Sequence, residues 1–338
     1  MKKSFNTFLY LLGAGASCKA LPMALKSTSN NKSDNNKSDF ATRLNEYSKD
    51  LLKFSQSQKS TYPPKNLEIW GNPCLNLINA IEWLADEASH HASIDTFAKK
   101  LYFKKDTTNL KKLKVTLSAY LISEQQKNPV DFRYDSFFAS ICEFDDDNHI
   151  CLPPNLRILT WNYDTQLEKA FYGFCEDKEL VLKKITYNRD QIRRINGCCG
   201  HEYPNANENY LSSIWDNKTY PEAWALAIDF YDKYMNPNCQ DIPDISFAWE
   251  KETYTLSSII KDLDKISVLI VIGYSFPYFN RNIDDKIFKN MGHLDKVYLQ
   301  CPPETYDSVK SRLDRLLPPH GEIIKRTDVD LFCIPDDL

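Results

Sequence analysis

The chain lacks any C-x-x-C pair, although it contains ten cysteines among its 338 residues. Structural zinc sites commonly take two ligands from such a pair, and the adjacent Cys198 and Cys199 do not replace that spacing. Ten cysteines are also too few, in a chain of this length, for a secreted scaffold held together by disulfides. We therefore expect no bound metal, reduced thiols and a cytoplasmic location.

Two further absences narrow the functional class. No apolar run reaches about 18 residues, the length expected of a membrane-spanning helix. The net charge is −4, so the chain has no excess of basic residues for binding a nucleic-acid backbone. Lys2 and Lys3 precede an apolar stretch as in a signal peptide, but that stretch leads into a glycine turn and is better explained as a strand. We expect neither membrane insertion nor direct nucleic-acid binding.

The apolar residues that are present predict an α/β protein. Hydrophobic residues make up 42% of the chain and aromatic residues 13%, enough for a substantial core. Strand-like and helix-like patterns alternate at both ends of the chain, and the clearest strands are 5–12, 156–160 and 268–272. This alternation predicts a Rossmann-like, mostly parallel sheet with helices on both faces.

The middle of the chain interrupts this alternation. Residues 66–144 carry helical periodicity with no intervening strand, which predicts an all-helical insertion within a single domain spanning residues 1–338. Residues 26–39 (KSTSNNKSDNNKSD) form a polar, low-complexity segment, either a flexible lid over a ligand or an insertion without a role. Residues 244–249 are predicted to form a further strand.

The first predicted strand runs directly into Gly13-Ala14-Gly15-Ala16-Ser17. A strand followed by a Gly-x-Gly turn is typical of phosphate binding, because glycine allows close approach and the next helix offers free N–H groups. The third glycine of the dinucleotide fingerprint would fall at Cys18, and no acidic residue follows at the usual ribose-binding distance. The turn is therefore nucleotide-like but unlike that of ordinary dehydrogenases. A tight turn without a ligand is the alternative.

Polar residues also follow other predicted strands, where open α/β sheets bind their ligands. Asn162 and Asp164 flank Tyr163 and could position a water molecule or a sugar hydroxyl, or they could cap the next helix. Gly273 and Ser275 repeat the small-residue turn after a second strand. Further along, Arg281 could pair with a phosphate or with Asp284.

Four segments in this order resemble the sirtuin-type NAD-binding domain, in the branch found in bacterial anti-phage defence proteins. They are GAGAS (13–17), TWNYD (160–164), Asn196-Gly197 and VIGYSFPYFNRNID (271–284). The resemblance implies NAD bound across the strand ends. The implied cofactor-binding residues are Gly13, Ala14, Gly15, Ser17, Asn196, Gly273, Ser275 and Asp284, and the implied catalytic residues are Asn162, Asp164 and His201.

The resemblance also implies a reaction. Classical sirtuins carry a zinc ribbon of two C-x-x-C pairs, and its absence argues against protein deacylation. The defence branch hydrolyses NAD to ADP-ribose and nicotinamide in an abortive-infection response, and we expect that activity. Asn196 stands where the family has its catalytic histidine, and an amide cannot accept a proton. His201 is the nearest histidine. The alternative is a weak or inactive subunit that binds NAD or an ADP-ribose derivative and gates a partner.

The resemblance carries expectations about assembly as well. The sirtuin-type domain would fill the whole chain, so the protein resembles the stand-alone effector of a two-component system. The implied partners are NAD, further copies of the same chain in a homo-oligomer, and a HerA-type hexameric ATPase.

Overall fold

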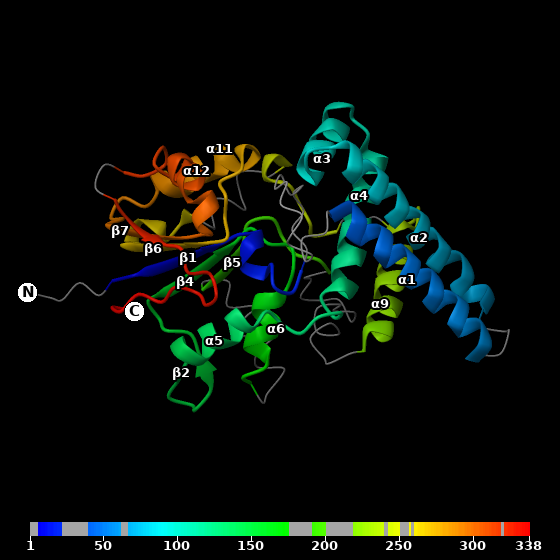
Figure 1. Cartoon of the computed structure of the whole chain (residues 1–338), viewed down its shortest axis with the longest axis horizontal. Coiled ribbons are helices and arrows are strands. Elements are labelled where there is room, and N and C mark those ends of the chain that lie inside the picture. Colours follow the sequence, from blue (N-terminus) through cyan, green and yellow to red (C-terminus); the bar gives the residue numbers. More distant parts are fainter. Residues whose placement is uncertain are drawn as a thin grey trace, which may run out of the picture. The chain divides into compact units, whose positions relative to one another are not determined.

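The computed structural model describes residues 6–21, 40–61, 67–175, 191–200, 219–239, 243–250, 257, 260–318 and 321–338 (Figure 1). The chain forms two compact units. The sheet unit comprises residues 1–19, 130–197 and 246–338, and the helical unit comprises residues 20–129 and 198–245. His201, residues 26–39 and residues 180–186, which the sequence predicts to form a further strand, lie outside the described residues.

The described part of the sheet unit contains one six-stranded parallel sheet. Its strands are β1 (Phe8–Leu12), β4 (Leu156–Thr160), β5 (Ile192–Arg194), β6 (Val268–Ile272), β7 (Lys296–Gln300) and β8 (Glu322–Arg326). They lie in the order β5-β4-β1-β6-β7-β8, and every neighbouring pair is parallel. Counted along this sheet alone, the order is 3-2-1-4-5-6, that of the doubly wound dinucleotide-binding fold. The predicted Rossmann-like fold class is confirmed.

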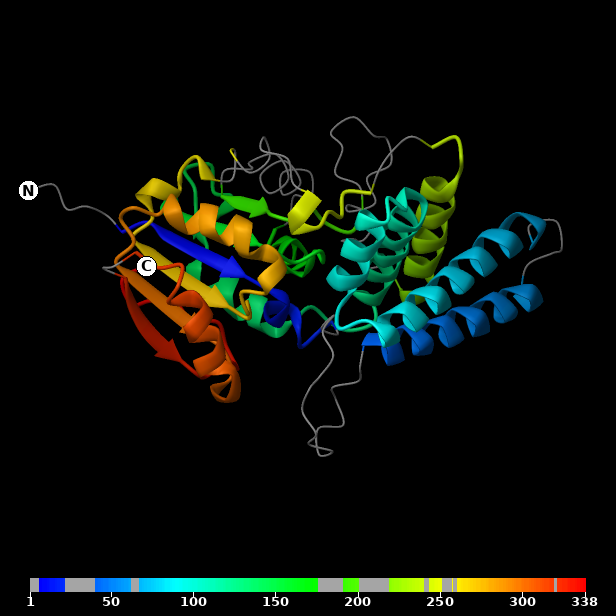
Figure 2. The same ribbon diagram turned by 90° about the horizontal axis from the view of Figure 1, so that it is seen from above.

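The two central strands β1 and β6 are apolar along their whole length because both of their faces are covered. Alternate side chains enter opposite cores: Leu9 and Leu11 lie in one, and Phe8, Tyr10 and Leu12 in the other. Helices α11 (Arg281–Lys289) and α12 (Pro303–Leu313) pack on the first face, and α5 (Phe132–Ile141) and α6 (Gln166–Tyr172) on the second. Figures 1 and 2 show this three-layer arrangement within the sheet unit.

Several short elements complete the sheet unit. A hairpin joins β2 (Glu143–Phe144) to β3 (Ile150–Cys151), and single 3₁₀ turns form at η1 (Ala14–Ser17), η4 (Ala248–Glu250), η5 (Leu263–Lys265) and η6 (Tyr278–Asn280). The predicted strand at residues 244–249 is wrong. Ser246 donates its N–H to Asn196 O (2.9 Å), in the loop that follows β5, and Phe247 donates to the Glu250 carboxylate (2.8 Å) within a local turn. These groups are therefore bound outside any strand ladder.

The helical unit contains α1 (Phe40–Thr61), α2 (Leu67–His90), α3 (Ile94–Phe103), α4 (Thr107–Glu124) and α9 (Tyr220–Met235). Helix α1 packs against α2, and α4 packs against α9. The sequence predicted an insertion over residues 66–144, but this unit already includes α1 and ends its first stretch at residue 129. Helix α5 belongs instead to the sheet unit, because Phe137 and Phe138 enter the core beneath the sheet. Across the described ranges, no helix is both long and apolar enough to cross a membrane.

Candidate functional site

The topological switch point of the sheet lies between β1 and β6. Glycines at the ends of these two strands bring the backbones into close contact there. Gly13 donates its N–H to Ile272 O and Gly15 donates to Gly273 O, both at 3.0 Å. A Cβ atom on Gly15 would lie 2.7 Å from Gly273 Cα, and one on Gly273 would lie 2.4 Å from the Gly15 carbonyl carbon. Gly273 also has a φ of +61°, which favours glycine. Close packing of two strand ends therefore accounts for these glycines, and the N–H groups of all three bind carbonyl oxygens.

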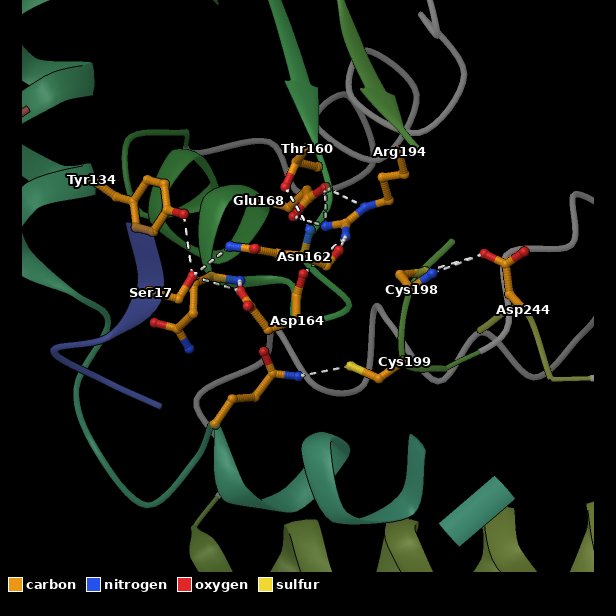
Figure 3. A network of polar contacts seen from close by, with 12 residues as sticks. Ser17, Tyr134, Thr160, Asn162, Asp164, Glu168, Arg194, Cys198, Cys199 and Asp244 are labelled. Carbon is orange, nitrogen blue, oxygen red and sulfur yellow. Dashed lines mark hydrogen bonds and ion pairs between the residues drawn. The ribbon is translucent and has the colours of Figure 1, made fainter. Parts of the chain in front are cut away.

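Beside this turn, the Ser17 hydroxyl is the centre of a buried polar cluster (Figure 3). Ser17 Oγ donates to Asp164 Oδ1 at 3.0 Å and accepts from Asn162 Nδ2 at 3.2 Å. The Tyr134 hydroxyl lies 3.2 Å from the same oxygen and can donate to it. All four residues are buried. The ends of β1 and β4 thus bring together three residues that the sequence predicted for one site. Helix α5 contributes the fourth, Tyr134.

Asn162 and Asp164 are held by the turn that follows β4. The Asn162 N–H donates to Thr160 Oγ1 at 3.1 Å, and the Gln166 N–H donates to Asp164 Oδ1 at 3.0 Å. Asp164 therefore accepts from the first N–H group of α6 as well as from Ser17, while the N-cap residue of this helix is Thr165. Burial raises the pKa of Asp164, although hydrogen bonds from Gln166 and Ser17 and the charge of Arg194 act in the opposite direction.

Arg194, the last residue of β5, fixes the same turn from its other side (Figure 3). Its Nη1 donates to Asn162 O at 3.0 Å and to Asp164 O at 2.9 Å, and its Nε donates to Glu168 at 2.9 Å. The Arg194 and Glu168 side chains are only 9% and 5% exposed, so this pair is strongly desolvated. The Arg194 guanidinium thus holds the carbonyl groups of Asn162 and Asp164 in one geometry, and this orients the side chains of both residues.

A second buried ion pair supports the first turn. Arg133 donates to Asp131 through Nε at 2.8 Å, and its Nη2 donates to Gly15 O at 3.0 Å and Ala16 O at 3.1 Å. Asp131 in turn accepts the Lys19 N–H at 3.1 Å. The pair therefore binds the backbone on both sides of Ser17 and holds η1 rigid.

Asn196, which follows β5, is buried with part of its amide unpaired. Its Nδ2 is 3.5 Å from the Tyr163 hydroxyl, and its Oδ1 accepts no hydrogen bond from the part of the chain that the structure describes. The side chain is 5% exposed. The Trp161 and Gln166 side-chain nitrogens, flanking the Asn162–Asp164 turn, are likewise buried without an acceptor among the described residues. Buried polar atoms of this kind are usually satisfied by water or a ligand.

The remaining predicted site residues lie after β6 and do not join the Ser17 cluster through any recorded hydrogen bond. Ser275 offers its carbonyl oxygen to Arg312 (2.8 Å). Asp284, in the first turn of α11, accepts from the Tyr274 hydroxyl at 2.9 and 3.0 Å. Tyr274 stacks on Trp161 with ring centroids 5.4 Å apart.

Sequence reasoning missed the residues that hold the cluster: Tyr134, Arg194, Glu168 and the Asp131–Arg133 pair. Arg194 had a usable signal, since a charged residue at the end of a strand beside a predicted site requires a partner. Tyr134 had none, because it lies in a helix whose aromatic residues all predict core. Comparison of the chain with protein-family models, curated proteins and solved structures found no match.

Proposed function

We propose that the protein is an NAD⁺ glycohydrolase of the sirtuin-like type, acting as the effector of an anti-phage, abortive-infection system. One observation carries the enzymatic part: Asn162 and Asp164 converge on Ser17 at the carboxyl ends of adjacent strands, in a sheet of the dinucleotide-binding order. Ligands of such sheets bind beyond these strand ends. The defence role rests on the four-segment resemblance.

The proposed reaction breaks the bond between nicotinamide and the ribose C1′. The bonding electrons neutralise the positive pyridinium nitrogen, the sugar takes on oxocarbenium character, and water adds to C1′ and releases a proton to solvent. The leaving group is already cationic, so the transition state needs positioning and charge stabilisation more than a strong base. Asn162 would position the water or the ribose, and Asp164 would supply negative charge beside the sugar.

The pairing of Asn162 favours this role. Its Nδ2 is bound by Ser17, whereas its Oδ1 accepts no hydrogen bond from the described residues and is available to a water molecule or a ribose hydroxyl. The unpaired Asn196 Oδ1 could accept from a second hydroxyl. A ribose offers more than one hydroxyl donor, so it could bind both of these acceptors.

The test is release of nicotinamide from NAD⁺, measured by chromatography with wild type and Asn162→Ala. We expect Asn162→Ala to reduce the rate at least a hundredfold, in the range found when one stabilising group is removed. The control is Asn290→Ala, an exposed amide at the end of α11, which should leave the rate within twofold. Equal rates in Asn162→Ala and wild type, or no release from wild type with or without its natural partner, would refute the proposal.

A second candidate is a subunit that binds NAD or an ADP-ribose derivative without cleaving it. Asn196 favours this candidate, because an amide stands where the resemblance expects the histidine base. Isothermal titration with intact NAD⁺, followed by chromatography of the recovered ligand, separates the two. Saturable binding with intact NAD⁺ recovered supports the binding subunit, and recovered ADP-ribose supports the enzyme.

The proposed partners follow from the resemblance alone. We propose that the chain forms a homo-oligomer and acts together with a HerA-type hexameric ATPase. Sedimentation of the purified chain, alone and mixed with the ATPase, tests both proposals. A monomeric chain would refute the homo-oligomer, and a chain that does not co-sediment with the ATPase would refute the partner.

A further inference from the structure

A pocket of about 300 Å³ opens between α11, α12 and the loop that follows β6. It is lined by Phe276, Tyr278, Arg281, Asp284, Arg312, Arg315 and Leu316. None of these residues belongs to the Ser17 cluster. Its volume is at the lower end of the range for small-molecule sites, about 300–1,000 Å³. The pocket is therefore large enough for a compact ligand of its own.

The charges around this pocket are almost all positive. Arg281, Arg312 and Arg315 line it, and no acidic side chain among the described residues forms an ion pair with any of them. Asp284 is the one carboxyl in the lining, and it is bound to the Tyr274 hydroxyl. Burial raises the pKa of Asp284 to about 8, so at neutral pH this carboxyl is mostly uncharged. Three like charges gathered in one pocket repel each other unless an anion joins them.

The type of cation indicates the type of anion. Guanidinium groups present paired N–H donors that match the oxygens of phosphate. Arg312 is already oriented, because its Nη1 donates to Ser275 O at 2.8 Å. The Arg281 guanidinium lies 5.8 Å from the centre of the Tyr278 ring. Tyr278 is 80% exposed, so its ring is accessible for stacking against a flat base.

We propose that this pocket binds a phosphorylated ligand of nucleotide size, with its phosphates held by Arg281, Arg312 and Arg315 and its base against Tyr278. The ligand class is defined by the phosphate, which a nucleotide and inorganic pyrophosphate share. This site is distinct from the Ser17 cluster and does not depend on NAD cleavage, although its lining includes Asp284, which the resemblance implies for NAD binding.

The experiment is isothermal titration of the full-length protein with ADP and, separately, with inorganic pyrophosphate. We expect both to bind wild type, and ADP to bind more tightly if Tyr278 stacks on the base. The variant Arg281→Gln/Arg312→Gln should weaken both ligands at least tenfold. Lys286→Gln/Lys289→Gln removes the same charge from α11 outside the pocket and should change either affinity less than twofold.

Arg315→Gln is a second test that does not disturb the Ser275 contact, and it should weaken both ligands at least threefold. Tyr278→Ala should weaken ADP alone and so distinguishes a nucleotide from free pyrophosphate. Absence of saturable binding to wild type would overturn the proposal. Equal losses in the arginine and lysine variants would also overturn it, because they would indicate diffuse charge in place of a site. Nicotinamide release is measured on the arginine variants as well, so that failure here is separable from failure of the proposed enzyme.

Discussion

At the scale of single residues, Ser17 is the group on which the candidate site depends. Its hydroxyl satisfies Asn162 Nδ2 and Asp164 Oδ1 at once, at 3.2 and 3.0 Å, and it is 2% exposed. Ser17→Ala would remove one hydrogen bond from each of these two buried side chains, which costs about 1–3 kcal/mol of stability. We expect a corresponding loss of stability in urea unfolding, and a fall in nicotinamide release because Asn162 loses its orientation.

The control for this prediction is Ser140→Ala. That hydroxyl is exposed and bonds only to the Ser136 carbonyl one turn earlier in α5, so its removal should change stability by less than about 0.5 kcal/mol. If the two serine variants unfolded alike, the buried cluster would contribute nothing measurable.

Residue identities predicted part of this cluster and missed the rest for a physical reason. Ser17, Asn162 and Asp164 could be found because each follows an apolar strand, and the carboxyl ends of parallel strands meet at one edge. Tyr134 and Arg133 could not, because the Ser17 hydroxyl that Tyr134 contacts and the Gly15 carbonyl that Arg133 binds are over a hundred positions away in the sequence. The close contact of Gly15 with Gly273 was equally hidden, since it depends on which strands are neighbours.

At the scale of elements, the contact between η1 and the end of β6 sets how closely the two halves of the sheet approach. Gly273→Ala would place a Cβ 2.4 Å from the Gly15 backbone at a φ of +61°. Neither backbone can yield without breaking the Gly15 N–H bond to Gly273 O. We expect a loss of more than about 2 kcal/mol in urea unfolding, because strain and a steric clash act together.

The matched control is Gly292→Ala, where an added Cβ meets nothing within 4 Å. Its stability should stay within about 0.5 kcal/mol of wild type. If Gly273→Ala matched Gly292→Ala, the backbones would have room to separate, and the glycines would need another explanation.

Elements differ in how well the sequence predicts them. Strands β1 and β6 were predictable because strands buried on both faces are continuously apolar, and β4 is apolar apart from Arg157 and Thr160. The stretch at 244–249 also contains apolar residues but forms no strand, since Ser246 bonds to the loop carbonyl of Asn196 and Phe247 bonds to the nearby Glu250 carboxylate. Helix α5 was grouped with the insertion because helical periodicity does not reveal which core a helix enters.

At the scale of the whole molecule, the sheet order explains why distant segments share a site. The buried carboxyl of Asp284 separately couples folding stability to pH. Asp284 is 1% exposed, and burial raises its pKa from 3.8 to about 8, with a smaller contribution from neighbouring Asp285. The unfolded chain therefore releases this proton near pH 4, whereas the folded chain holds it until about pH 8. Folding binds a proton between these values, so the Asp284 contribution to stability falls as pH rises from about 4 to 8 and is then constant.

Asp284→Asn should remove this dependence, because the amide oxygen can still accept from Tyr274 but carries no proton to lose. Urea unfolding of wild type and variant at pH 5, 6, 7, 8 and 9 measures it. The free-energy difference should move in favour of the variant by up to about 1.4 kcal/mol per pH unit below pH 8 and level off above it. Pyrophosphate bound in the same pocket would bring negative charge near Asp284 and disfavour its carboxylate form, so adding it should move the levelling point to higher pH. A difference that is the same at every pH would show that Asp284 ionises normally in the fold, and the pocket would then carry a negative charge beside its arginines.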